Sequence, residues 1–382
     1  MELVRATQDF VIAGQPYPKF PILLWDSMES CVPANQFFRH YLLRGEIGSD
    51  RSWPSAGRAL YDFFSFLQAH EMNWRDVDRG EAKSLVAAYR DYCLVTCELG
   101  PNTTRQRLSY ICKFYKYALK EGWVNRLPFS FEERTVSRES RFLAHVDASG
   151  GKNMANDVMP RCRKVLPKFL SMAEIKSLLA AAENPHHRMM IRLALHTGLR
   201  REEIAAFPLA YILDPHKAGR AERNLRLRLD PFDGSGMVTK GSKSRDIYVS
   251  CKFMAELYRY VTKIRGERVS PSKTPPKTLL LNQSGEPYGD NGKSLNRIIS
   301  EIGKRAGIKV HAHMLRHTYA TQTLVSLQRT AESGLEPLVF VQRQLGHSSI
   351  QTTMVYLHLV NEMADKAVLA YDDELYALAG TV

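Results

Sequence analysis

The chain has 382 residues, 44% of them hydrophobic, which is too long for one small domain and suits two compact domains that each bury a core without disulfide staples. Lysine and arginine outnumber aspartate and glutamate by 53 to 40, for a formal charge of +13. This balance is typical of a protein whose partner is a polyanion, nucleic acid first of all, although it can also serve solubility or attraction to a membrane surface.

The start of the chain argues against secretion and membrane insertion. MELVRATQDF has neither a basic start nor an apolar h-region, and FPILLW is far too short to span a bilayer. Cys93 and Cys97 are one helical turn apart without a second ligand pair nearby, which favours a helix face over a metal site. We expect a cytoplasmic protein with no metal, no membrane partner and six reduced thiols: Cys31, Cys93, Cys97, Cys112, Cys162 and Cys251.

The first part of the chain is predicted to be a helical domain with a short extension before it. Residues 1–26 are either an accessory arm or a strand packed on the first domain. Residues 27–130 carry apolar residues three and four apart, which predicts four helices forming a small bundle. The four stretches are VPANQFFRHYLL, AGRALYDFFSFLQAH, KSLVAAYRDYCLV and TTRQRLSYICKFYKYALKEG.

The last of these stretches has two faces. An apolar stripe is formed by Leu108, Ile111, Tyr115 and Leu119. Ser109 lies among four cations on another face, and no acidic residue accompanies them. We interpret this basic stripe as a track for nucleic-acid phosphates, with an ordinary solvated face as the alternative. Its four cations are Arg105, Lys113, Lys116 and Lys120.

A charged stretch without periodicity, residues 131–165, is predicted to be a linker to a second domain, residues 166–382, which ends in a tail. Ser171 and Glu174 match a capping box at the start of this domain. The rest is mostly helical, except that apolar and polar residues alternate within residues 224–250. This alternation predicts a short antiparallel sheet, with Gly241-Ser242 as a tight turn beside Lys240. The fold class is therefore mainly α with a small antiparallel β-sheet.

Four short segments of the second domain, here called islands, contain candidate catalytic side chains. In HTGLRREEIAAF, Gly198 breaks a helix and Arg200 stands three residues before Glu203. Lys240 lies at the predicted turn. In HAHMLRHTYATQTL, a histidine and an arginine share one helical face. In LGHSSIQTTMVYLH, a glycine ends one helix, Ser348 or Ser349 caps the next, and a tyrosine follows nine residues after a histidine. Taken singly, each island fits surface charges, a half-buried histidine or a core tyrosine.

Together the islands resemble the active site of the tyrosine recombinases, the family of phage integrases and Xer recombinases. The matching letters include Thr-Gly-Leu-Arg, Lys-Gly-x-Lys-x-Arg, His-x-Leu-Arg-His-Thr-x-Ala-Thr, and Leu-Gly-His followed by Thr-Thr and Tyr. The resemblance covers residues 166 to about 360, and residues 27–130 resemble the core-binding domain less specifically. It implies six catalytic residues: Arg200, Lys240, His313, Arg316, His347 and Tyr356.

The resemblance implies a chemistry for which these residue types are suited. Two guanidinium forks and two imidazoles can hold the oxygens of a phosphodiester while charge builds on phosphorus. Tyr356 is the implied nucleophile, Lys240 the general acid for the leaving oxygen and His313 the base. Lys243 lies close enough to compete with Lys240 for the general-acid role. Lys243 and Arg245 are also candidate DNA contacts. No cofactor is implied.

The implied function is site-specific DNA recombination through a 3′-phosphotyrosine link, integrating or excising a mobile element. The implied partners are a double-stranded DNA recombination site, a homo-tetramer assembled on DNA and an accessory DNA-bending protein, with the protein associated with the nucleoid. A type IB topoisomerase and a catalytically silent DNA-binding regulator are the alternatives. Two features have no assigned role: an insertion around residues 325–340, and a tail that could dock on a neighbouring protomer or on its own domain.

Overall fold

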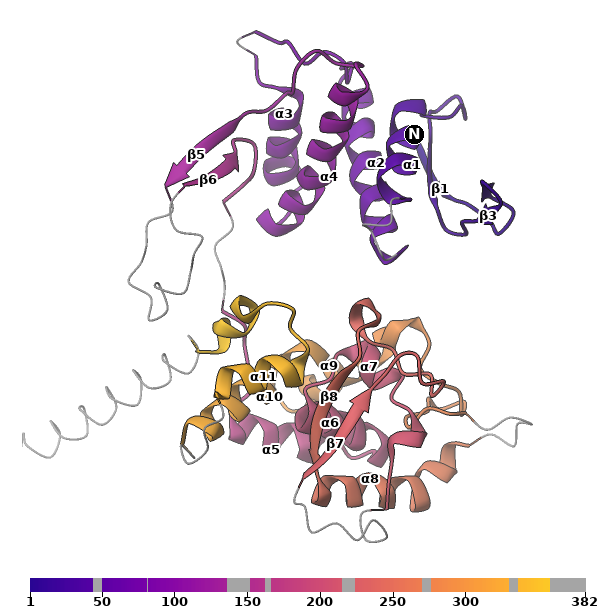
Figure 1. Ribbon diagram of the computed structural model, residues 1–382, viewed down its shortest axis with the longest axis vertical. Helices are drawn as coiled ribbons and strands as arrows, with labels where there is room; N and C mark the ends of the chain where they lie inside the picture. The colour runs from indigo at the N-terminus through magenta and orange to yellow at the C-terminus, as the bar shows by residue number, and fades with distance from the viewer. Residues whose placement is uncertain are drawn as a thin grey trace, which may run out of the picture. The chain divides into compact units, whose positions relative to one another are not determined.

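The computed structural model describes residues 1–43, 50–80, 82–135, 152–161, 166–214, 224–269, 276–329 and 336–357. The chain forms two compact units, Met1–Lys164 and Val165–Val382, and both are mainly helical with small antiparallel strand pairs (Figure 1). The predicted fold class is confirmed. Within the described residues no helix is both long and apolar enough to cross a membrane.

The first unit is a bundle of the four predicted helices around an aromatic core. Phe63, Phe64 and Phe114 are fully buried, and Phe64 meets Phe114 edge-on with ring centroids 5.4 Å apart. Burial of such large rings contributes most of the apolar area that stabilises a small bundle. The helices are α1 (Val32–Leu42), α2 (Trp53–Ala69, after the short η1, Asp50–Ser52), α3 (Leu85–Asp91, continued by a π-helical turn, Tyr92–Thr96) and α4 (Pro101–Lys120).

Residues 1–26 form a small β layer on this bundle. Strand β1 (Glu2–Arg5) pairs antiparallel with β4 (Pro21–Leu24), and the short β2 (Val11–Ile12) pairs with β3 (Gln15–Pro16). A Cβ at Gly57 of α2 would lie 2.8 Å from the Cβ of Pro21, so glycine is what permits the strand pair to approach the helix so closely. Of the two readings of this segment, a strand packed on the first domain is the one found.

The predicted linker contains a strand pair and is in this respect wrong. Strand β5 (Phe131–Thr135) pairs antiparallel with β6 (Lys152–Asn156), and Val158 behind it is buried in the core of the first unit. The Asn156 side chain donates to Cys112 Sγ at 3.4 Å. Glu132 and Glu133 are exposed, so this pair lacks the apolar alternation that reveals a half-buried strand. The rest of the predicted linker, residues 136–151 and 162–165, lies outside the described residues.

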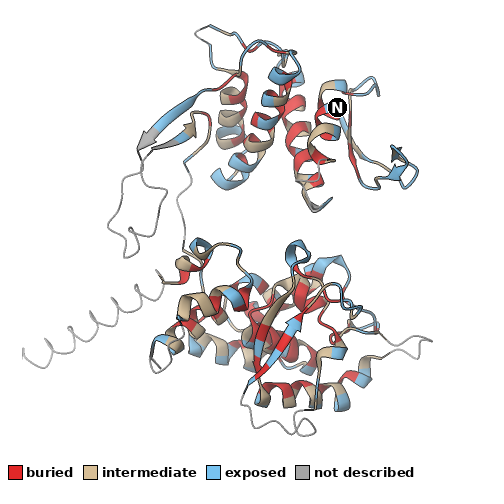
Figure 2. Cartoon of the chain, in the orientation of Figure 1, coloured by how far each residue is buried: buried red, intermediate tan, exposed pale blue. Residues whose placement is uncertain are grey.

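The second unit packs helices around the strand pair of β7 (Asn224–Leu229) and β8 (Arg245–Ser250). Leu225, Leu227 and Leu229 are buried and alternate with exposed residues, as predicted (Figure 2). The predicted capping box at Ser171–Glu174 opens α5. The helices are α5 (Met172–Ala181), α6 (Pro185–Thr197), α7 (Arg201–Ala205), α8 (Cys251–Lys263), α9 (Lys293–Arg305), α10 (Ala312–Arg329) and α11 (Pro337–Leu345), with single turns at Leu209–Tyr211, Lys240–Ser242, Arg265–Arg268 and Asp290–Gly292.

The connection between β7 and β8 is longer than the predicted tight turn. Residues 230–244 join the two strands, and Gly241-Ser242 forms only a local turn within them, with φ values of 70° and 50°. The side chain of Gln344 fastens α11 to the edge of β8: its Nε2 donates to Tyr248 O at 3.1 Å and its Oε1 accepts from Tyr248 N at 2.9 Å. This pairing places the C-terminal end of α11 beside the sheet.

Candidate active site

The implied catalytic residues come from elements that are far apart in the sequence. Arg200 precedes α7, His313 and Arg316 lie on α10, and His347 follows α11. Tyr356 lies on the helix that begins at Ile350, where Ser349 Oγ accepts from Gln351 N at 3.2 Å and so caps the first turn.

Two guanidinium groups meet at the end of α11. Nη2 of Arg316 donates to Leu345 O at 2.7 Å, and Nη2 of Arg200 donates to the next carbonyl, Gly346 O, at 3.3 Å. Gly346 then turns the chain with φ of 66° into the segment that carries His347. The two cations are therefore held at consecutive carbonyl groups of one turn.

Arg200 is oriented by a buried carboxylate. The capping glycine Gly198 ends α6 with φ of 63°, and Arg200 then caps α7 in an extended conformation. Glu203, 1% exposed, accepts from the Arg200 backbone N at 2.7 Å and from its Nη1 at 3.1 Å. The predicted Arg-x-x-Glu spacing thus has a structural role: it fixes the guanidinium while leaving about a fifth of the side chain exposed.

Arg245, which was predicted to contact DNA, is turned toward Glu203 in the structure. Its Nη1 and Nη2 donate to the two oxygens of Glu203 at 2.8 and 2.6 Å, and its side chain is 10% exposed. A bidentate ion pair of this kind occupies the donors that a phosphate would need. Burial of Glu203 opposes its charge, but the Arg245 and Arg200 guanidinium groups outweigh burial and lower its pKa to about 2.

Arg316 is almost completely buried, with 1% of its surface exposed. Nη1 donates to Gly198 O at 2.6 Å, so this residue satisfies carbonyl groups at the C-terminal ends of both α6 and α11. Burial and repulsion from Arg200 lower its pKa to about 9, which leaves it charged at neutral pH. A buried cation held by neutral carbonyl groups is poised to gain from a nearby anion.

The two implied catalytic histidines lie around this pair of cations. Nδ1 of His347 is 2.9 Å from Thr353 Oγ1, and the His347 ring lies nearly parallel to the Tyr356 ring, with centroids 6.2 Å apart. Burial and the charge of Arg316 lower the pKa of His313 to about 4 and that of His347 to about 3. Both rings are therefore neutral at neutral pH and can donate one N–H each.

Tyr356 has its hydroxyl inside the cluster rather than on the surface. The residue is 2% exposed, and burial raises its pKa although Arg316 and Arg200 oppose the shift. Its Oη lies 2.8 Å from Nδ1 of His317. The sequence motif includes His317 directly after Arg316 but does not mark it as catalytic. Its position one helical turn after His313 does predict that the two rings are neighbours. Their centroids are 4.4 Å apart.

The implied general acid lies in the connection between the strands. Lys240 is exposed, and its charge is close enough to contribute to the lowered pKa of His313. Lys243, its competitor, is also exposed. Among the described residues, no group of three or more histidine, cysteine, aspartate or glutamate side chains is arranged to hold a metal ion.

The predicted basic stripe on α4 is exposed along its length, at Arg105, Lys113, Lys116 and Lys120. The Lys113 ammonium lies 4.8 Å from the centre of the Tyr41 ring, and the Lys116 ammonium 4.7 Å from that of Phe131. Leu119, which was assigned to the apolar stripe, is 38% exposed, so the buried face of α4 ends at Ala118. Aromatic rings beside the cations hold the ammonium groups in place.

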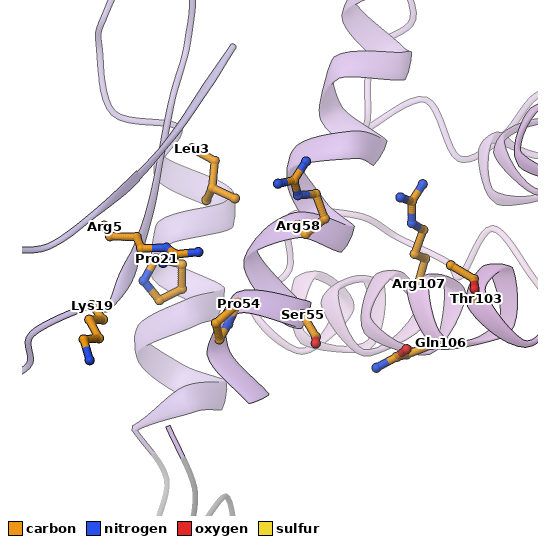
Figure 3. A pocket seen from close by; sticks show the side chains of 10 residues that line it. All are labelled: Leu3, Arg5, Lys19, Pro21, Pro54, Ser55, Arg58, Thr103, Gln106 and Arg107. Carbon is orange, nitrogen blue, oxygen red and sulfur yellow. The ribbon is translucent and has the colours of Figure 1, made fainter. Parts of the chain in front are cut away.

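The first unit has a second basic feature that the sequence did not reveal. A hollow of about 340 Å³ lies between the β1–β4 pair, α2 and α4, and each of these elements contributes a cation (Figure 3). Arg107 is paired with Asp62 at 2.8 Å, whereas Arg5, Lys19 and Arg58 form no ion pair among the described residues. The lining consists of Leu3, Arg5, Lys19, Pro21, Pro54, Ser55, Arg58, Thr103, Gln106 and Arg107.

Comparisons with known proteins give matches to the family whose active site the sequence motifs resemble. Residues 168–363 match the model of the phage integrase family. Tyrosine recombinase XerD of Rickettsia conorii is 24% identical over 343 residues, which covers 87% of this chain and 96% of that protein. Tyrosine recombinase XerD of Caulobacter vibrioides is 27% identical over 322 residues, which covers 80% of this chain and 85% of that protein.

Two solved structures share the fold. The XerH site-specific recombinase bound to its palindromic difH substrate, a post-cleavage complex, superposes with a TM-score of 0.56 at 18% identity, covering 84% of this chain and 80% of that one. The Tn1549 transposon integrase in complex with a circular intermediate DNA gives a TM-score of 0.53 at 15% identity, covering 85% of this chain and 94% of that one.

Proposed function

The chain belongs to the phage integrase family, the tyrosine recombinases, and from this membership and its site we propose that it cuts and rejoins double-stranded DNA at a specific sequence through a 3′-phosphotyrosine intermediate. One observation carries the proposal. Arg316 and Arg200 donate to the consecutive carbonyl groups of Leu345 and Gly346, in the turn that leads to Tyr356. Two fixed cations beside one buried phenol suit an attack on a phosphodiester.

In the proposed reaction the two guanidinium groups bind the non-bridging oxygens of the scissile phosphate, and the charge that develops on these oxygens strengthens the contact. His313 and His347, neutral in the free protein, donate hydrogen bonds to the same group. The phenolic oxygen of Tyr356 forms a bond to phosphorus, and the bond from phosphorus to the 5′ oxygen breaks. Lys240 gives the leaving oxygen its proton.

The phosphotyrosine link conserves the energy of the broken bond. A 5′ hydroxyl from a partner strand can therefore attack it and restore the DNA without a nucleotide cofactor. Integration or excision of a mobile element is the biological role that we propose. The relatives named tyrosine recombinase XerD support recombination, rather than simple strand passage, as the class of role.

The proposed DNA contacts of the first unit are the basic stripe of α4 and the hollow beside the β1–β4 pair. Exposed cations that form no ion pair within the described part of the chain, such as Arg5, Lys19 and Arg58, are suited to the phosphate backbone, which positions a protein on DNA without reading its sequence. Lys243 is the proposed contact in the second unit. Two structural neighbours were solved bound to DNA, which supports this partner.

The proposed working state is a homo-tetramer on two DNA duplexes, with an accessory DNA-bending protein where the site requires one. Sedimentation velocity of the chain with and without its DNA site tests the assembly. We expect a species of four protomers only when DNA is present. A complex that never exceeds one protomer per duplex, under conditions where strands are exchanged, would rule out the tetramer.

The central experiment captures the covalent adduct. A library of random-sequence duplexes, each with one nick, is incubated with the full chain, and DNA that becomes covalently attached to protein is recovered and sequenced. We expect adducts that share one sequence. Tyr356→Phe should bind the recovered DNA with unchanged affinity and form no adduct, because the substitution removes only the nucleophilic oxygen. An adduct formed by this variant would show that the nucleophile is another residue.

The recovered site also separates the alternatives. A type IB topoisomerase relaxes supercoiled plasmid that lacks the site, whereas the proposed recombinase joins strands between two duplexes that carry it. A silent regulator would bind the recovered sequence and form no adduct. Arg200, Lys240, His313, Arg316, His347 and Tyr356 all have side chains competent for the reaction, which supports activity over a silent role.

A further inference from the structure

We propose that His317 is the base that removes the phenolic proton of Tyr356 during attack on DNA. This inference rests on the proposed function and adds a catalytic residue to it. His313 was the base implied by sequence resemblance. The structure instead places Nδ1 of His317 at 2.8 Å from Oη of Tyr356. A proton acceptor must lie within hydrogen-bond reach of the proton that it takes, and His317 does.

The fold positions this pair firmly. His317 lies on α10, directly after Arg316, whose guanidinium fixes that turn of the helix to Gly198 and Leu345. Tyr356 is 2% exposed, and its ring lies nearly parallel to the His347 ring, with centroids 6.2 Å apart. The His317 ring also meets the His313 ring edge-on, with centroids 4.4 Å apart, which limits its rotation. The hydrogen bond therefore joins two side chains that are both packed in place.

The electrostatic surroundings keep His317 free to accept a proton. Burial first, and then the charges of His313, Arg316 and His311, lower its pKa to about 3, so the ring is neutral in the free protein. A neutral imidazole carries one acceptor nitrogen. The titratable groups that face the pair are His313 and Arg316 on α10, His311 just before it, Arg200 before α7, and His347 after α11.

A bound phosphodiester changes this balance in the direction that the reaction requires. Its negative charge would lie beside Arg200 and Arg316 and offset the repulsion between Arg316 and a charged imidazole, so the pKa of His317 rises when DNA binds. The free protein then keeps Tyr356 as a phenol, and the proton can leave only when a phosphate is present. A nucleophile controlled in this way is not deprotonated before it has a target.

The proposed step is balanced in both directions. The Tyr356 oxygen bonds to phosphorus while its proton moves to Nδ1 of His317, and the leaving 5′ oxygen receives a proton from Lys240. When a 5′ hydroxyl later attacks the phosphotyrosine, Lys240 takes the hydroxyl proton and His317 returns its proton to the departing phenolate. Neither direction needs an oxidant, a metal or a nucleotide.

Two substitutions separate proton transfer from positioning. His317→Ala removes the hydrogen bond, whereas His317→Asn places an amide oxygen close to the position of Nδ1 and retains a hydrogen-bond acceptor that cannot hold a proton. We expect both to slow single-turnover adduct formation on the nicked site by about 10²-fold or more. His187→Asn is the matched control. His187 lies on α6 and is not among the groups that face the pair, so the variant should react at the wild-type rate.

A modified leaving group identifies the proton involved. DNA with a sulfur in place of the bridging 5′ oxygen releases a thiolate that needs no proton, so the defect of the two His317 variants should persist on it. The rate of the wild-type chain should fall as the pH decreases through the DNA-bound pKa of His317, and this decrease should be absent in His317→Asn.

The experiment distinguishes failure of the proposed function from failure of the proposed role of His317. If the wild-type chain forms no adduct, the proposed function fails. If it does, and His317→Asn reacts within about 3-fold of the wild-type rate, a decrease far below that expected for a missing general base, His317 is not the proton acceptor. Rescue of either His317 variant by the sulfur-substituted DNA would also overturn the inference, because it would assign the residue to the leaving group.

Discussion

Glu203 is the residue on which the arrangement of cations depends. Its two oxygens accept from Arg200 and Arg245, and it is the buried carboxylate from which both guanidinium groups take their direction. Replacement of Arg245 by a neutral residue would leave that carboxylate with half of its partners, an imbalance that costs about 3–5 kcal/mol in buried pairs. Arg245 thus supports the site by holding the carboxylate that orients Arg200.

Acid should weaken the second unit through this carboxylate. The pKa of Glu203 is about 2 in the folded chain against 4.5 for an ordinary glutamate. A depressed pKa contributes stability that is complete above the unfolded value and is lost as the pH falls toward the folded value. We expect a loss of roughly 3 kcal/mol between about pH 5 and pH 2, measured by urea unfolding.

The control for this prediction is Glu301→Gln, which removes an exposed carboxylate paired with Arg297 on α9. This variant should keep the wild-type decline. Glu203→Gln should start less stable at neutral pH and lose less on acidification. Equal declines in the two variants would show that Glu203 is not the group responsible.

Lys240 should be distinguished from Lys243 by the leaving group. Lys240→Ala is expected to slow adduct formation by about 10²–10⁴-fold on ordinary DNA, because the 5′ oxygen then leaves without a proton. A sulfur leaving group should restore its rate, the reverse of the result expected for His317. Lys243→Ala should react at nearly the wild-type rate and bind DNA slightly less tightly. The opposite pattern would assign the general acid to Lys243.

At the scale of elements, two glycine-terminated helices bring the site together. Gly198 ends α6 and Gly346 ends α11, both in the left-handed region, and each is followed within two residues by an implied catalytic side chain. A Cβ at Gly346 would lie 2.6 Å from Cδ of Arg245, and one at Gly198 would overlap the Tyr319 ring. These glycines are required by close packing as well as by backbone conformation.

Gly198→Ala should therefore cost more than backbone strain alone. We expect it to destabilise the second unit by about 2–4 kcal/mol, from left-handed strain together with clashes against Tyr319 and Leu345. Gly307→Ala is the control, because Gly307 has φ of 70° but open space where its Cβ would lie, and it should cost only about 1–2 kcal/mol. Urea unfolding of both variants measures the difference, and equal losses would mean that packing at Gly198 is unimportant.

The strand pairs show how local pattern can mislead at this scale. β7 was predicted because one face is buried and its leucines alternate with polar residues. β5 and β6 were missed because no buried apolar stripe marks them: Glu132, Glu133 and Met154 are all exposed. Pairing between two separated segments, rather than a buried stripe, makes them strands. For residues 1–26 the sequence left two interpretations, an accessory arm or a strand packed on the first domain, for a related reason. The β1–β4 pair packs closely against α2, and the local sequence does not reveal that contact.

At the scale of the whole molecule, the charge of +13 is distributed over both units and includes the hollow of the first. If Arg5 and Lys19 bind phosphates, their joint replacement by glutamine should weaken DNA binding and make it less dependent on salt. The slope of log affinity against log salt should become shallower by about 0.9 for each phosphate that the variant no longer neutralises. Binding to the recovered site is measured across a series of salt concentrations.

A charge-matched control separates direct binding from general attraction. Arg75→Gln with Arg126→Gln removes the same charge from the first unit at residues that do not line the hollow. That double variant should retain most of the slope. At saturating protein the hollow variant should form the Tyr356 adduct at the wild-type rate. A slope equal to that of the control would remove the hollow from the DNA interface.

The class of the molecule and the identity of its reactive groups could be predicted from the order of residues alone. Helical periodicity, capping signals such as Ser171 with Glu174, and short motifs are local, so neighbouring letters suffice to predict them. The motif letters also named Arg200, Arg316 and Tyr356 as residues that belong together. The expectation that Arg245 contacts DNA came from the same letters, which carry no sign of its pairing with Glu203.

The orientation of those groups became known from the folded chain and could not be predicted from the sequence. That Arg245 faces Glu203, that His317 rather than His313 meets the Tyr356 hydroxyl, and that Arg5, Lys19 and Arg58 share a hollow all depend on contacts between segments distant in sequence. The charge of a residue follows from its type, but the group that the charge contacts depends on how distant segments pack. The sequence of a basic residue is therefore the same whether its side chain faces a phosphate or a buried carboxylate.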